Sequence, residues 1–153
     1  MTDSAAIVVA ASISAVVAMI VVGLQYQLER SRRAKDARAE RLARFMGTSH
    51  EIVLGLGDVA RAPEAEKKAL LTRLEMDQRV RINQALAELR LQEKHEVVRE
   101  AKALDFELVR LTRLVEEKVW SPEDWRGQRD GLDVLVKASE TTGREALGYP
   151  PLD

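Results

Sequence analysis

The chain has 153 residues, which is enough for one compact domain and too few for two well-packed ones. Its 24 basic and 25 acidic residues nearly cancel, which argues against a dedicated nucleic-acid-binding protein. Because the sequence contains no cysteine, it forms neither disulfides nor thiolate metal sites. A composition rich in Ala, Leu, Glu and Arg, with 8 Gly and 4 Pro, favours helix along most of the chain.

The first predicted element is a transmembrane helix over residues 5–24, after a short external tail at residues 1–4. This uncharged stretch of 20 residues would span about 30 Å as a helix, the thickness of the hydrocarbon layer of a bilayer. A cleaved signal peptide is the alternative, but it needs a basic region before the apolar stretch, and Asp3 is the charged side chain there. The sequence therefore predicts a retained membrane anchor.

A basic juxtamembrane stalk is predicted over residues 25–38, directly after the anchor. No Lys or Arg precedes the anchor, so the positive-inside rule places the N-terminus outside and the body in the cytoplasm, at the inner (plasma) membrane. The basic residues of the stalk are also a candidate interface with membrane lipid, through anionic head groups. The alternative is that they only set the orientation, because acidic residues interrupt the run. The candidate interface residues are Arg30, Arg32, Arg33, Lys35 and Arg38.

Small residues recur at every fourth position of the predicted anchor, at Ala10, Ser14 and Ala18. This spacing allows two helix backbones to approach closely within a membrane. It makes the chain a possible homo-oligomer through its anchor. The alternative is that the spacing arises by chance in an alanine-rich segment.

The body is predicted to contain four amphipathic helices within residues 39–147. The first, at 39–61, has small or apolar residues every three or four positions, and it ends before Pro63 because the residue before a proline resists helical geometry. Its repeating positions are Ala39, Leu42, Met46, Ser49, Val53, Leu56 and Ala60. A second helix follows at 64–91, with an apolar face outlined by Leu71, Leu74, Ile82, Ala85 and Leu89.

A turn near residues 92–94 is predicted to separate the second helix from a third at 95–119. The step from Leu89 to Val97 rotates a helix by about 80° from a whole number of turns, so the two apolar stripes are out of phase. A turn restores both stripes to one core. The alternative is a single long helix over residues 64–119, since no Gly or Pro marks the turn.

The fourth helix is predicted at residues 122–147, because Ser121 is a good N-cap and Pro122 suits the first helical position. Gly148 is a plausible stop, and residues 148–153 are expected to form a short tail. Four helices with short connections pack most simply as an antiparallel bundle. The predicted fold is therefore all-α, with one N-terminal transmembrane helix that continues into a cytoplasmic antiparallel four-helix bundle.

Three runs on these helices, ALAELRL at 85–91, VVREA at 97–101 and GREALG at 143–148, carry a resemblance to a known kind of protein. Behind an N-terminal anchor they resemble uncharacterised small single-pass membrane proteins of high-GC bacteria with an Ala/Arg/Leu-rich helical body. The resemblance covers most of the chain as a pattern of composition and spacing. It implies a bacterial inner membrane and a helical bundle, and it implies no activity.

Residues with catalytic or metal-binding potential do not form a recognisable motif. Neither His50 nor His95 has a glutamate three residues before it, as a bundle metal site would require, so two solvated histidines and no cofactor are expected. No serine lies in a Gly-x-Ser-x-Gly turn, and no phosphate-binding loop is present. Trp120 and Trp125 are a candidate partner-binding surface, and the alternative is that they close one end of the core.

The sequence therefore predicts a non-enzymatic, membrane-anchored helical interaction module that presents its bundle to an unknown protein partner or to itself. A regulator that senses anionic lipid or membrane stress through the basic stalk is the alternative. An enzyme that uses carboxylates in the bundle core is a third hypothesis, which no motif supports.

Overall fold

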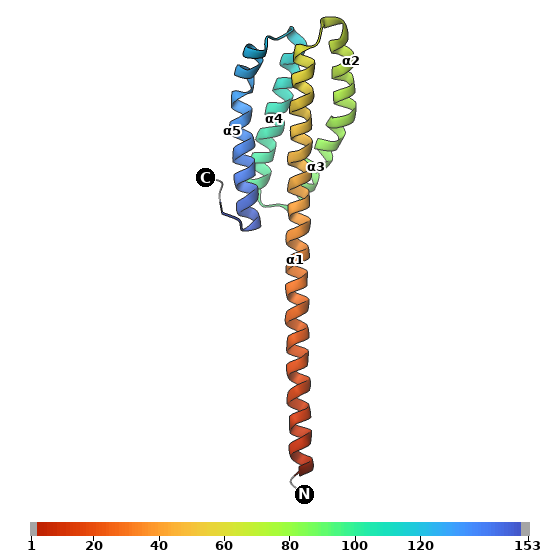
Figure 1. Cartoon of the computed structure of the whole chain (residues 1–153), viewed down its shortest axis with the longest axis vertical. Helices are drawn as coiled ribbons and strands as arrows, with labels where there is room; N and C mark the ends of the chain where they lie inside the picture. The colour runs from red at the N-terminus through yellow and green to blue at the C-terminus, as the bar shows by residue number, and fades with distance from the viewer. Residues whose placement is uncertain (1–2, 151–153) are drawn as a thin grey trace. The chain divides into compact units, whose positions relative to one another are not determined.

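The computed structural model describes residues 3–150 of the chain, and the side chains of residues 18–150. Within this part of the chain there is no strand, which confirms the all-helical prediction. The helices, labelled in Figure 1, are α1 (Asp3–Arg61), α2 (Glu64–Leu74), the π-helical turn η1 (Glu75–Arg79), α3 (Val80–Gln92), α4 (His95–Glu117) and α5 (Pro122–Leu147).

The chain divides into two compact units, Met1–Ala37 and Arg38–Asp153. In the first unit every residue from 18 to 37 is exposed, including the apolar side chains Met19, Val22 and Leu24. Among the side chains that the structure describes, no helix combines the length and the hydropathy that a membrane crossing requires. Residues 5–17 of the predicted span lie outside those side chains.

The second unit is a helical bundle, as predicted. Its part of α1, then α2 to α3, then α4, then α5 run in alternating directions around one core (Figure 1). Every helix except η1 contributes buried apolar side chains to this core. The largest fully buried ones are Phe45, Leu56, Ile82, Leu89, Leu104, Leu108, Leu111, Val115 and Leu132.

The ends of the helices follow from local chemistry. Pro63 is extended and α2 begins directly after it. The turn between α3 and α4 consists of Glu93 and Lys94, both extended, so residues 64–119 do not form one helix. Ser121 caps α5 by accepting a hydrogen bond from the backbone N–H of Asp124 at 3.1 Å, and Gly148 ends it in the left-handed region, at φ 79°.

The π-helical turn interrupts the second helix of the bundle. All five residues of η1 are at least partly exposed, so this turn adds nothing to the core. The preceding Leu74 packs against the backbone of α1 at Gly55, where a Cβ atom would overlap the Leu74 methyl group. A glycine is therefore required at this position for Leu74 to keep its place.

Candidate functional site

The predicted basic interface divides between the two units. Arg30, Arg32, Arg33 and Lys35 are exposed in the first unit, where Arg33 pairs with Glu29 at 3.4 Å. Arg38 instead belongs to the bundle, and its inclusion in an exposed lipid-binding set is wrong. Its guanidinium is held by protein groups, because a buried carboxylate and a free helix-end carbonyl lie within its reach.

These partners make Arg38 part of an ion cluster centred on Glu93. Arg38 Nε lies 2.8 Å from one carboxylate oxygen of Glu93, and Arg38 Nη1 donates a 3.0 Å hydrogen bond to the carbonyl of Ala146. Arg41 donates to the other oxygen of Glu93 from Nη2 at 2.7 Å and from Nε at 3.2 Å. The Glu93 side chain has 0% exposed area. The cluster therefore joins α1, the α3–α4 turn and the end of α5.

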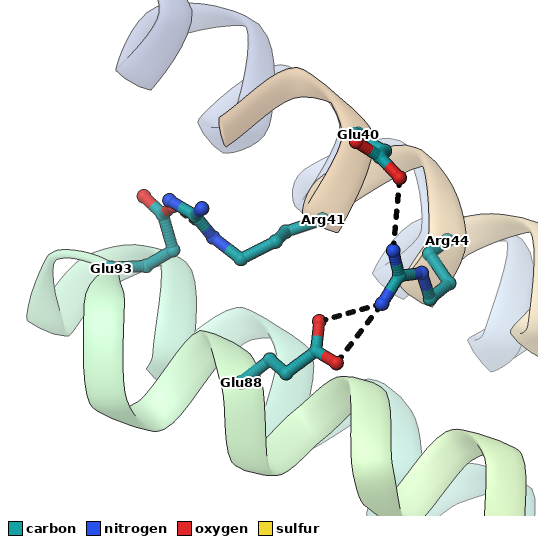
Figure 2. Close-up of polar contacts among 5 residues, drawn as sticks. All are labelled: Glu40, Arg41, Arg44, Glu88 and Glu93. Carbon is teal, nitrogen blue, oxygen red and sulfur yellow. Dashed lines mark hydrogen bonds and ion pairs between the residues drawn. The ribbon is translucent and has the colours of Figure 1, made fainter. Parts of the chain in front are cut away.

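A second, more exposed group of ion pairs lies beside the first. Arg44 donates to both oxygens of Glu88 at 3.0 Å and to Glu40 at 3.0 Å. Figure 2 shows Arg44 between Glu40 and Glu88, with the Arg41 guanidinium against the Glu93 carboxylate. The chemical consequence is neutralisation. Because Glu93 is held by two guanidinium groups, it is unsuited to act as a general base, and the cluster is a structural clamp.

The two tryptophans are buried, with Trp120 9% and Trp125 3% exposed. The interpretation of this pair as an exposed partner surface is therefore wrong, and the alternative, that they close the end of the core, is correct. Their rings lie 6.1 Å apart, and Trp120 Nε1 donates to the carbonyl of Leu114 at 3.0 Å. The backbone N–H of Trp120 also donates to the carbonyl of Ala60, which ties the α4–α5 connection to α1. Burial and these bonds leave the rings unavailable to a partner.

The other predicted sites are placed as follows. Ala10 and Ser14 lie outside the described side chains, and Ala18 is exposed. His50 and His95 are exposed, on α1 and at the start of α4. No group of three or more His, Cys, Asp or Glu with the geometry of a metal site occurs among the residues described.

Sequence reasoning did not identify the outward side of α2 and η1, where an apolar surface lies open. Ala65, Ala69 and Thr72 are exposed there, and Met76 is 71% exposed. The Thr72 hydroxyl donates to the Lys68 carbonyl at 2.8 Å, so its hydrogen-bonding capacity is used within the helix. We call these four residues the outer face of α2. The signal for it in the sequence is their spacing of four, three and four, which follows one side of a helix.

On the opposite side of η1 a groove of about 330 Å³ lies between α1, η1 and α4. Its apolar floor includes Ile52 and Val109, and oppositely charged side chains alternate around its rim: Glu75, Arg79, Arg113 and Glu116. Nearby on α4, the hydrogen bond from Arg110 to Glu107 raises the pKa of the guanidinium, against a smaller opposite effect of burial. The charges around the groove balance, so it has no evident preference for an anionic or a cationic ligand.

No family model, curated protein or solved structure matches this chain. The function is therefore inferred from the molecule's own surfaces and chemistry.

Proposed function

We propose that this chain is a non-enzymatic helical interaction module, anchored in a membrane by residues 5–24, whose bundle binds a protein partner or a second copy of itself. In this proposal the bundle lies in the cytoplasm, at the inner membrane. The mechanism is recruitment, because an anchor confines the bundle to two dimensions and raises its effective concentration near membrane partners.

The observation that carries the proposal is the exposure of consecutive apolar side chains before a basic run. Met19, Ile20, Val21, Val22 and Leu24 are each between 46% and 68% exposed. A contiguous apolar surface of this kind needs a lipid or protein cover. The uncharged sequence that precedes it and the arginines that follow it favour lipid as the cover.

The chemistry of the bundle supports an interaction role over a catalytic one. The buried carboxylate of Glu93 is neutralised by Arg38 and Arg41. The exposed apolar face of α2 has the features of a contact surface, with no titratable group at its centre.

The anchor is tested by fractionating cells that express the full chain. Val21→Arg places a charge in the apolar run, at a cost of about 2.5–3.5 kcal/mol of insertion energy at the centre of a span and less toward its end. We expect this change to move protein from the membrane fraction to the soluble fraction. Val134→Arg is the matched control, since Val134 is an exposed valine on α5. If the unmodified chain itself is soluble, the anchor is disproved.

The orientation is tested with the same protein, which has the advantage of containing no cysteine. A single cysteine is introduced at Thr2 or at Val134, and intact cells are treated with a membrane-impermeant maleimide. We expect labelling at position 2 and protection at position 134 until the membrane is opened. The reverse pattern would contradict a cytoplasmic bundle.

A second candidate function is favoured by the exposure of Arg30, Arg32 and Lys35, which make no ion pair within the part of the chain that the structure describes. Such side chains are free to bind anionic lipid head groups, as a lipid-sensing regulator requires. Here the test is binding of the full chain to vesicles with and without phosphatidylserine, at low and high salt. Equal binding to both kinds of vesicle would exclude lipid recognition by the stalk.

A further inference from the structure

The outer face of α2 lies directly opposite the side that contacts the core. Leu71 is buried on the core side, while Ala65, Ala69, Thr72 and Met76 point outward and are exposed. The α2 helix is therefore apolar on two sides, although the bundle covers one of them. A second cover is missing from the isolated chain.

The shape of this face combines a hollow and a projection. A hollow of about 660 Å³ is lined by residues of α2 and η1 alone, among them Ala65 and Ala69. The hollow exists because these side chains are short. Met76, at the other end of the face, is long, flexible and exposed. A second copy turned end for end would place its own Met76 over the hollow.

We propose that the outer face of α2 binds the same face of a second copy of this chain, with the two helices antiparallel. Ala65 then lies opposite Met76 of the second copy, and Ala69 opposite its Thr72. A two-fold axis makes each such contact occur twice, as in other symmetric dimers. This inference rests on the proposed function, of which it names the partner.

The charges beside the face choose this orientation. Lys68 and Glu75 border it on one flank, and Glu66 and Arg73 border it on the other, and all four are exposed. In an antiparallel helix pair like flanks meet, so Lys68 faces Glu75 of the second copy and Glu66 faces its Arg73. A parallel pair would instead bring the opposite flanks together, with Lys68 against Arg73. The antiparallel pair is therefore attractive on both flanks, and the parallel pair is repelled.

The size of the surface links the dimer to the anchor. Two helices of four to five turns each make a small interface, under about 1,200 Å² in total, which is typical of transient association. Confinement to a membrane raises the effective concentration enough for such a contact to be populated. The dimer therefore depends on the anchor, and it dissociates when the protein is diluted in detergent.

The orientation is tested by disulfide crosslinking of the full chain in membranes. Ala65→Cys and Met76→Cys variants with tags of different size are co-expressed and treated with a mild oxidant. We expect the mixed 65–76 dimer and little Met76→Cys homodimer, because the two positions 76 lie about 16 Å apart along an antiparallel pair. A Met76→Cys homodimer as the main product would indicate a parallel pair and overturn the proposal.

The ion pairs are tested by reversing charges in the same crosslinking background. Lys68→Glu and Glu75→Lys each place like charges together, and we expect each alone to reduce the crosslink several-fold. Mixing the two variants makes both pairs attractive again and should restore it. Lys102→Glu, an exposed change on α4, is the matched control. If the mixed variants crosslink no better than either alone, these ion pairs are excluded.

Failure of this inference is distinguishable from failure of the proposed function. Membrane and soluble fractions are taken from every crosslinked sample. Membrane-bound chain that gives no 65–76 crosslink overturns the dimer and leaves the anchor intact. Chain that is recovered in the soluble fraction overturns the anchor, and the membrane-dependent dimer with it.

Discussion

Glu93 shows how a buried charge is retained when its surroundings supply two counter-charges. Its carboxylate would lose a large hydration energy on burial, and Arg38 and Arg41 offset this loss with short, charge-assisted contacts. Both arginines keep part of their side chains in solvent, so their own desolvation is incomplete. The pair of arginines and the carboxylate thus fix the α3–α4 turn against α1.

Replacing this carboxylate tests the clamp. Glu93→Gln keeps the shape but leaves two guanidinium groups without their charged partner, so we expect a loss of about 2–3 kcal/mol in the free energy of unfolding. Glu88→Gln is the control, because Glu88 pairs with Arg44 at the surface and its loss costs about 0.5 kcal/mol. Urea unfolding of the full chain in detergent, followed by circular dichroism, measures both. Equal losses in the two variants would contradict a buried clamp.

Gly57 is a second residue at which a single atom matters. A Cβ added there would lie 3.7 Å from Trp125 Nε1, a buried N–H without a hydrogen-bond partner. Gly57→Ser brings a hydroxyl within reach of that N–H. Gly57→Ala lacks the hydroxyl and gains only helix propensity, about 1 kcal/mol, of which serine gains about half.

We therefore expect Gly57→Ser to be at least as stable as Gly57→Ala, because the new hydrogen bond offsets the lower helix propensity of serine. Thermal unfolding of the two variants and the parent chain gives the comparison. A serine variant less stable than the alanine variant by the full propensity difference would show that the hydroxyl does not reach Trp125.

At the scale of the elements, the sequence predicts best where one local signal decides the structure. Proline at position 63 and the capping serine at 121 mark helix starts by their own geometry. The phase difference between Leu89 and Val97 indicates a turn without any Gly or Pro, and the structure has its turn at residues 93–94. Each of these signals lies within a few residues of the feature that it predicts.

Features that depend on distant segments are missed. Glu93 lies in a polar stretch and is buried only because residues 38–41, more than fifty positions earlier, fold over it. Trp120 and Trp125 have the composition of a binding surface, and only the closing of the bundle decides that they lie inside. The π-helical turn has no signal in the sequence. The outer face of α2 consists mostly of small residues, which a search for large apolar side chains passes over.

At the scale of the whole molecule, the core draws only on residues from Leu42 onward, within the unit Arg38–Asp153. Residues 18–37 bury nothing in the isolated chain. The stability of the bundle is therefore independent of those residues, while membrane attachment depends on the first unit. The boundary between the two roles lies at Arg38, whose clamp belongs to the bundle.

This division predicts the behaviour of two N-terminal truncations. A fragment that begins at Arg38 keeps every core residue and the Glu93 clamp, so we expect it to fold as a soluble helical protein with cooperative unfolding. A fragment that begins at Gly47 loses Phe45, which is 1% exposed, together with Leu42 and both arginines of the clamp. Removing a buried Phe alone costs about 3–5 kcal/mol, a large part of the 5–15 kcal/mol typical of a domain. Circular dichroism and urea unfolding of both fragments decide the outcome. Cooperative unfolding of the shorter fragment at the same urea concentration would show that residues 38–46 are no part of the bundle.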